Sequence, residues 1–332
     1  MAALLLLAGC RSEPVTPELV EQSRLAMGAT LRVAVWTGNR EGATHAIEQV
    51  FVEFDRLEQA LSVWRPDSDV QRLNAAAGRG PVRVGADTIA VLEAAAEASR
   101  LTRGKFDITF GALSDVWRFD HDQDNHVPTN EEIAERLPLI DYPAVRVDAS
   151  TGRAEILRPG VRVHLGGIGK GYAVSRAADL LRRSGFRDFL IHAGGDLYAA
   201  GRRGDRPWRV GLYDPRGSEG ATFASIELSD ETFSTSGDYE RFFIQDNIRY
   251  HHLLDPDTGQ PARGCRSVTI LARSALTADW ASTGVFILGP EAGMALVEDL
   301  PDVEAVIVTA DNEVKVSSGL KARLRVDRPP TP

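Results

Sequence analysis

The segment from Val163 to Ala173 places the strongest constraint on the fold, because a strand-like run there breaks into a glycine-rich turn and then enters a helix. Its sequence is Val-His-Leu-Gly-Gly-Ile-Gly-Lys-Gly-Tyr-Ala, in which four glycines surround Lys170. Backbone N–H groups of such a turn and the N-terminus of the following helix can face an anion, and Lys170 adds a full positive charge. The segment therefore predicts a site for a phosphate or diphosphate group. The alternative is that Lys170 is a solvated lysine at a helix start.

Two common nucleotide-binding motifs do not fit this segment. Gly171 rather than Ser or Thr follows Lys170, and the glycine spacing of a P-loop is absent. The chain also does not open with a βαβ unit, so the sequence does not indicate a Rossmann fold. The predicted anion site must therefore belong to another kind of fold.

The charge balance excludes one class of partner. The chain has 332 residues with 47 acidic against 38 basic side chains, which gives a net charge of −9. A protein that binds nucleic acid needs a basic face to neutralise phosphates, so we expect no nucleic-acid partner. A polyanionic small substrate would need a metal ion or a local cluster of cations. The length is compatible with two domains or with one α+β domain.

The first residues resemble a bacterial lipoprotein signal. A short apolar run with small residues at its end leads directly to Cys10, which predicts cleavage after Gly9 and a lipid on Cys10. The run is too short to span a bilayer as a helix, and the alternative is an unprocessed hydrophobic N-terminus. We expect a signal peptide over 1–9, a lipidated tether over 10–24 and a folded domain over 25–325. The protein would then face the periplasm from the inner membrane, and Cys265 would be its single thiol.

Hydrophobic periodicity predicts an α+β fold, a compact mixed fold with an antiparallel sheet packed by helices. Alternation over 31–35 predicts a strand, whereas Ser62–Asn74 reads as a polar loop and Ser236–Tyr239 as a turn between strands. Successive strand-like runs with short connections favour antiparallel pairing. Helices are predicted over 43–61, 88–102, 172–183, 277–287 and 290–299, and further strands over 189–191, 197–199, 208–212, 223–228, 241–244, 268–271, 304–308 and 313–316.

Five segments in a fixed order carry a family resemblance. Besides the glycine-rich turn and the Ser234–Tyr239 segment, they are Met27–Thr30, Gly104–Thr109 and the late block that runs from Tyr250 to Thr283. Together they resemble the flavin transferases of the ApbE type, the FAD:protein FMN transferases, over nearly all of the chain after residue 25. The resemblance implies Mg²⁺-dependent transfer of the FMN half of FAD to a Ser or Thr hydroxyl of an acceptor flavoprotein subunit in a membrane redox complex. AMP is released.

The resemblance implies a metal site at Asp279, Thr283 and the backbone carbonyl of Gly167. Asp279 and Thr283 lie four positions apart, so their oxygens share one face of a helix. Mg²⁺ needs few protein ligands, because substrate phosphates and water complete its shell. From the residues alone, Asp279 is explained equally well as an acid that compensates a helix dipole.

The resemblance also implies the residues that hold FAD and transfer the proton. His252 corresponds to the histidine that acts as a base or a phosphate ligand, and an imidazole suits both roles near neutral pH. A thioether and aromatic rings suit flat ring systems, although Trp64 could instead cap a helix pair and Met27 and Phe106 could be core residues. The implied FAD contacts are Met27, Trp64, Lys105, Phe106, Asp107, His164, Lys170 and Leu253.

One departure from the family and two other functions remain open. The family usually has Asp where this chain has His164, which changes the hydrogen-bond inventory at that position. The same cavity would suit an FAD pyrophosphatase that uses water as the nucleophile, or a lipoprotein that binds FAD without catalysis. The transferase and the pyrophosphatase both need Asp279 and Thr283 as metal ligands, whereas a protein that only binds FAD does not.

Overall fold

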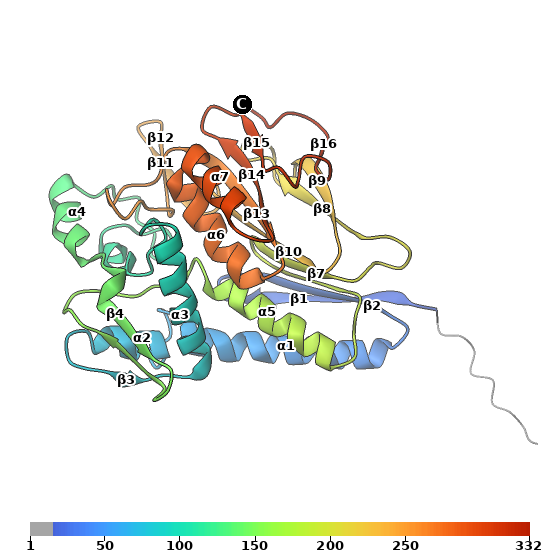
Figure 1. The fold of residues 1–332 in the computed structure, drawn as a ribbon, viewed down its shortest axis with the longest axis horizontal. Coiled ribbons are helices and arrows are strands. Elements are labelled where there is room, and N and C mark those ends of the chain that lie inside the picture. The colour runs from blue at the N-terminus through green and yellow to red at the C-terminus, as the bar shows by residue number, and fades with distance from the viewer. Residues whose placement is uncertain (1–15) are drawn as a thin grey trace, which may run out of the picture.

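A computed structural model describes residues 16–332, and its centre is an eight-stranded sheet (Figure 1). All neighbouring strands in this sheet run antiparallel, in the order β1-β2-β6-β7-β10-β13-β14-β15. The strands are β1 (Glu18–Ala26), β2 (Ala29–Thr37), β6 (Phe189–Ala193), β7 (Asp196–Ala200), β10 (Glu231–Gly237), β13 (Cys265–Ala272), β14 (Val303–Thr309) and β15 (Val314–Val316).

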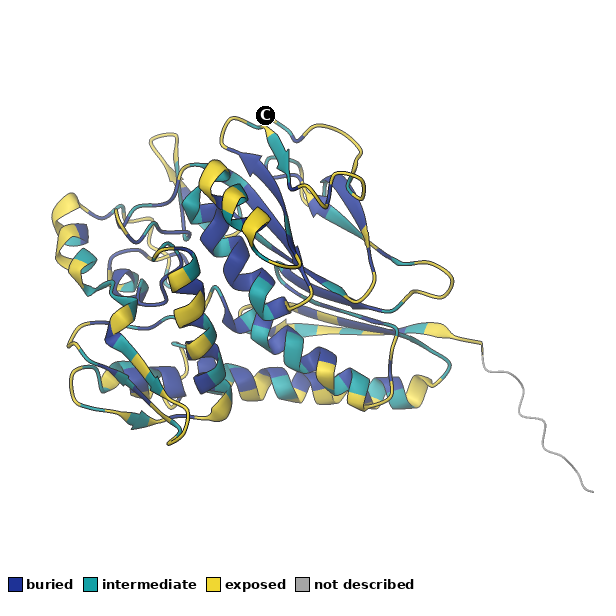
Figure 2. Ribbon diagram, viewed as in Figure 1, coloured by how far each residue is buried: buried dark blue, intermediate teal, exposed yellow. Residues whose placement is uncertain are grey.

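Strands in the middle of this sheet bury apolar side chains on both faces, so both faces must be covered. Helices cover one of them. In α1 the side chains of Phe54, Leu57 and Leu61 follow the three- and four-residue spacing of a helix and are buried in the main hydrophobic core. Figure 2 shows α6 mostly buried and α7 with an exposed outer face. The four helices are α1 (Arg40–Leu61), α5 (Gly169–Arg183), α6 (Ala275–Leu288) and α7 (Pro290–Asp299).

A smaller three-stranded sheet covers part of the opposite face. Its order is β16-β9-β8, and Phe223 and Ile226 pack there against Phe233 and Val306 of the large sheet. The core is therefore layered as helices, large sheet and small sheet. The strands are β8 (Trp208–Tyr213), β9 (Thr222–Leu228) and β16 (Arg325–Val326).

The remaining segments gather at one end of the molecule, on the left of Figure 1. Trp117 and Phe119 from this region stack near Phe243 of a two-stranded hairpin, β11 and β12, and so tie the hairpin to it. The elements here are α2 (Asp69–Ala75), α3 (Ala86–Leu101), α4 (Asn130–Arg136), β3 (Val82–Arg83), β4 (Val145–Asp148), β5 (Arg153–Ile156), β11 (Phe242–Gln245), β12 (Ile248–His251), and three short 3₁₀ helices at Gly111–Asp115, Leu137–Leu139 and Tyr142–Ala144.

The α+β prediction is confirmed, and all five predicted helices form within a few residues of their expected bounds. Three local predictions are wrong. The tether predicted up to residue 24 runs into β1, which escapes notice because only Val20 and Ala26 of this edge strand are buried. The predicted loop contains α2, which begins where the Ser68 side chain accepts a hydrogen bond from Gln71 N at 2.9 Å.

The third error concerns the first half of the turn predicted over Ser236–Tyr239, since only Asp238 and Tyr239 form a turn, which joins β10 to β11. Ser236 and Gly237 instead end β10, which lies between β7 and β13 in the middle of the sheet. Hydroxyl side chains made this strand resemble a turn, although they are buried against other hydroxyl groups. Across residues 16–332, no helix has the length and apolar character needed to cross a bilayer. The predicted signal peptide and Cys10 lie outside the described residues.

Candidate active site

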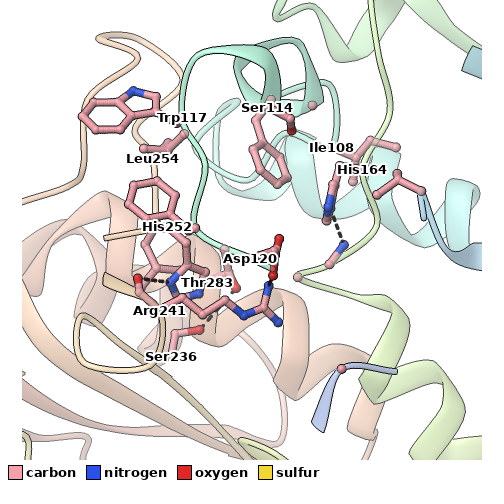
Figure 3. Close-up of a pocket in the computed structure, with 18 of the residues that line it drawn as sticks. Ile108, Ser114, Trp117, Asp120, His164, Ser236, Arg241, His252, Leu254 and Thr283 are labelled. Atoms are coloured by element: carbon pink, nitrogen blue, oxygen red, sulfur yellow. Dashed lines mark hydrogen bonds and ion pairs between the residues drawn. The ribbon is translucent and has the colours of Figure 1, made fainter. Parts of the chain in front are cut away.

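A cavity of about 810 Å³ opens where the large sheet meets the end region (Figure 3). Trp64, Phe106 and His164 line it from the end region, and Thr283 of α6 and His252 line it from the other side. The glycine-rich turn also borders the cavity, immediately before the first turn of α5. The structure thus brings most of the residues implied by the resemblance to one place.

The glycine-rich turn allows α5 and α6 to approach each other closely. A Cβ atom on Gly171 would lie 2.3 Å from the backbone oxygen of Ala275 and 2.5 Å from Cβ of Asp279, so a side chain cannot fit there. Gly171 N donates a hydrogen bond to Oδ2 of Asp279 at 2.7 Å. A Cβ on Gly167 would lie 3.2 Å from Oγ1 of Thr283. Asp279 and Thr283 therefore both lie against this turn.

Asp279 is buried, and its surroundings disfavour a negative charge. Burial and then the nearby Asp196 carboxylate raise the pKa of this carboxyl to about 7. Lys170 opposes this effect, and its Nζ lies 3.2 Å from Oδ2 of Asp196. Burial works against the Lys170 charge as well, but Asp196 and Asp279 raise its pKa well above the usual range. One lysine is therefore shared by two buried carboxylates.

A short hydroxyl network fixes the side of α6 that faces β10. Ser236 Oγ lies 2.8 Å from Ser282 Oγ and 3.2 Å from Oγ1 of Thr283. Ser234 Oγ donates to Oδ1 of Asp196 at 2.6 Å. These contacts orient the Thr283 hydroxyl beside the glycine-rich turn and satisfy one oxygen of Asp196.

The oxygen donors at this turn fit Mg²⁺. Asp279 offers a carboxylate oxygen besides the one that accepts from Gly171 N, Thr283 offers a hydroxyl, and Gly167, which packs against Thr283, offers a backbone carbonyl. All three are hard oxygen ligands of the kind that Mg²⁺ prefers. No cluster of three or more His, Cys, Asp or Glu side chains suited to a metal occurs in the described part of the chain. A site here would thus rely on substrate and water for its other ligands.

His252 follows β12 and continues the ladder of the hairpin. Its backbone N donates to the carbonyl oxygen of Arg241 at 3.2 Å, and its Nδ1 lies 3.3 Å from the same oxygen. This contact favours the tautomer with a proton on Nδ1, which leaves Nε2 as an acceptor. Burial and then the Arg241 charge lower the His252 pKa to about 3, so the ring is neutral at pH 7. The neighbouring His251 instead contacts the Ala262 carbonyl at 2.8 Å inside the core.

The side chains expected to hold FAD fall into two groups. Phe106 and Leu253 are buried in the cavity wall, and Trp64 lies at its edge with 48% of its surface exposed and its ring 4.4 Å from that of His121. Met27 packs beside Gly169, and the cavity is lined by the two residues after it instead. The aromatic side chains expected to contact FAD, Trp64 and Phe106, therefore both line the cavity.

Two of the expected polar contacts are already engaged within the protein. Lys105 Nζ pairs with Asp255 at 2.7 Å and with Asp257 at 2.8 Å. Oδ1 of Asp107 accepts from the backbone N of Thr109 at 2.7 Å, and its Oδ2 accepts from the backbone N of Tyr142 at 3.1 Å. Both residues line the cavity, but their first role is to hold the loops around it.

His164 stands where the resemblance leads us to expect a carboxylate, and its ring is neutral. Burial lowers its pKa to about 4, so it carries no charge at pH 7. Its Nδ1 accepts a hydrogen bond from Gly166 N at 3.0 Å, which places the ring proton on Nε2. The position therefore offers a donor where a carboxylate would offer only acceptors.

The sequence interpretation missed several charged residues of the cavity, among them Asp196, Arg241 and Asp120. Asp196 follows Gly194-Gly195 and pairs with Lys170, a signal similar to the glycine-rich turn that could have drawn attention to it. Arg241 and Asp120 form an ion pair at 2.8 Å across 121 positions of the chain. No local sequence pattern predicts an ion pair between residues so far apart in the chain.

The cavity is lined by aromatic side chains, and around it lie a glycine-rich turn, a buried carboxyl and hydroxyl pair and a neutral histidine. This combination is typical of a nucleotide-binding enzyme, here with an α+β fold. Residues 27–307 match the model of the ApbE family, and the chain belongs to that family. A Treponema pallidum protein named FAD:protein FMN transferase is 33% identical, with coverage of 92% of this chain and 88% of the relative. A Vibrio cholerae protein of the same name is 32% identical, with coverage of 95% and 94%.

Solved structures agree with this assignment. The crystal structure of the ApbE protein from Thermotoga maritima superimposes with a TM-score of 0.85 at 34% identity, and covers 92% of this chain and 99% of its own. The flavin transferase ApbE from Vibrio cholerae gives a TM-score of 0.83 at 28% identity with the same coverage. The fold of the chain is therefore that of the family.

We expect Mg²⁺ alone to raise the melting temperature of the wild-type protein by roughly 2–5 °C at saturating concentration, because a ligand that binds only the folded state stabilises it. Asp279→Asn should abolish this shift, since it removes the charged ligand. Asp69→Asn is the matched control: this buried carboxyl, which bonds Gly85 N and Thr88 outside the cavity, should lower stability but keep the shift. Differential scanning calorimetry measures both, and an unchanged shift in Asp279→Asn would exclude the site.

Proposed function

We propose that the chain is an FAD:protein FMN transferase, which moves the FMN half of FAD to a Ser or Thr hydroxyl of an acceptor flavoprotein subunit in a membrane redox complex. The observation that carries the proposal is the position of Asp279 and Thr283 against the glycine-rich turn, inside the cavity that also contains His252. The names of the relatives support the same activity.

The residues around the glycine-rich turn would bind the diphosphate of FAD. The N-terminus of α5 and the charge of Lys170 favour an anion at this position. Asp279, Thr283 and the carbonyl of Gly167 would hold Mg²⁺, which when bound neutralises charge on the phosphate oxygens. Phe106 and Trp64 supply apolar surface for the flat rings.

His252 would accept the proton of the acceptor hydroxyl. The hydroxyl oxygen forms a bond to the phosphorus of the FMN half, the bond from that phosphorus to the bridging oxygen breaks, and AMP leaves with the electron pair. His252 suits this role because its Nδ1 is held by the Arg241 carbonyl and Nε2 is free to accept. The negative diphosphate would raise the low pKa of the ring, since an opposite charge favours the protonated imidazole.

The decisive test uses purified protein, FAD, Mg²⁺ and an acceptor domain. We expect a mass gain of one FMN on a Ser or Thr of the acceptor and one AMP released per transfer, measured by mass spectrometry and chromatography. Free FMN with no labelled acceptor would show an FAD pyrophosphatase. Bound FAD with neither product would show a carrier protein.

His252→Ala should slow transfer by about 10²- to 10⁴-fold, the usual range for loss of a general base, while FAD binding changes little. His251→Asn is the matched control, because His251 bonds the Ala262 carbonyl in the core: it should lower the melting temperature and spare the rate per folded molecule. Single-turnover labelling and flavin fluorescence separate the two effects. Equal losses of rate and affinity in His252→Ala would reduce His252 to a binding residue.

The proposal includes a lipid anchor on Cys10 and a place in the bacterial cell envelope, facing the periplasm from the inner membrane. The small residues before Cys10 and the membrane location of the proposed acceptor support it. In cells that express the chain, Cys10→Ser should move the protein from the membrane fraction to the soluble fraction. An immunoblot that finds wild type and variant in the same fraction would contradict the anchor.

A further inference from the structure

Arg241 is a charged residue of the cavity that the proposed mechanism does not use. It immediately precedes β11, and its side chain points into the cavity, where Nη1 lies 2.8 Å from Oδ1 of Asp120 (Figure 3). Its own backbone carbonyl is the oxygen that holds His252. The guanidinium therefore belongs to the same wall as the histidine.

Ionisable groups on other walls of the cavity sense this guanidinium. After burial, Arg241 is the largest cause that lowers the pKa of His252. Burial lowers the pKa of His164, and Arg241 contributes to this while Asp120 opposes it. Arg241 is also among the charges that act on Lys170. Arg241 also lines the same cavity as Gly166, Gly167 and Lys170, the segment that would surround a bound diphosphate.

Lys170 alone does not supply the positive charge that a diphosphate requires. Asp196, 3.2 Å away, and Asp279 already compensate its single charge. Arg241 has one carboxylate partner, Asp120, and the two side chains are 35% and 29% exposed. Water competes with the two side chains for each other's charge, so the Arg241–Asp120 ion pair is weak. Arg241 is therefore a cation whose partner a ligand can replace.

We propose that Arg241 binds the diphosphate of FAD, and that Asp120 holds the guanidinium in place until the substrate enters. The inference rests on the proposed function, since it assumes a flavin dinucleotide in this cavity. A guanidinium can bond two phosphate oxygens at once, as it bonds a carboxylate, so the exchange of Asp120 for phosphate conserves the geometry of recognition. The released Asp120 carboxylate then turns to water.

The segment that carries Asp120 has other contacts that remain after this exchange. The His121 ring contacts the Trp64 ring at 4.4 Å, and Gln123 Nε2 donates to the Phe242 carbonyl at 3.3 Å. Loss of the Asp120 carboxylate should therefore leave the segment in place. This allows the two partners of the ion pair to be tested separately.

The experiment measures binding of FAD and of riboflavin, which has no phosphate, to the purified full chain by flavin fluorescence. Arg241→Gln should weaken FAD binding about 10- to 100-fold, as expected for a lost charged hydrogen bond, and change riboflavin binding less than about threefold. Arg241→Lys keeps the charge but loses the planar fork, so it should fall between. Asp120→Asn frees the guanidinium and should leave FAD binding unchanged or tighter.

Arg158→Gln is the matched control, because Arg158 forms a 2.6 Å ion pair with Asp141 outside the cavity and should change neither affinity. Equal losses in Arg241→Gln and Asp120→Asn would show that the pair only supports the loop, and a parallel loss of riboflavin binding would show a structural role. Either result overturns the inference. If Arg241→Gln loses affinity for FAD alone while the wild type labels no acceptor, the inference stands and the transferase proposal falls.

Discussion

The close approach of α5 to α6 is the constraint on which the site depends. It exists because Gly171 has no side chain, so that the backbone of α5 can touch α6 and donate to Asp279. The same approach brings Gly167 beside Thr283 one helical turn further along α6. Any Cβ at Gly171 would push the helices apart, and Asp279 and Thr283 would then no longer lie against the glycine-rich turn. A single glycine thus converts helix packing into a binding geometry.

This geometry has an electrostatic cost in the folded protein. Burial raises the pKa of Asp279 from 3.8 to about 7, so the folded state holds a proton that the unfolded chain would release. The contribution of Asp279 to the free energy of unfolding therefore falls as the pH rises from 3.8 to about 7. A cation bound beside Asp279 would relieve the penalty, because it favours the ionised carboxylate. A buried carboxylate that would favour a bound metal ion thus destabilises the fold when no ion is bound, a common trade-off at functional sites.

The sequence was sufficient where the signal is local. The buried face of α1 repeats at helical spacing, and the glycine-rich turn, Asp279 and Thr283 each lie in a short motif. Features that depend on distant residues could not be predicted. Strand β1 pairs with β2, but most of its side chains are not buried. Strand β10 buries hydroxyl groups whose partners are brought near only in the folded protein. The Arg241 ion pair joins two distant loops for the same reason.

His164 shows how one substitution can change what the cavity recognises without changing the fold. The ring occupies the wall next to the glycine-rich turn and bonds Gly166 through Nδ1, so Nε2 presents a proton. A carboxylate at this position would require a donor on the ligand, whereas this ring requires an acceptor, such as a phosphate oxygen or a carbonyl of a flavin ring. Because the ring is neutral, it adds no negative charge to the cavity, whereas the carboxylate that the resemblance leads us to expect there would add one. A neutral ring would therefore repel a phosphate group less than a carboxylate would.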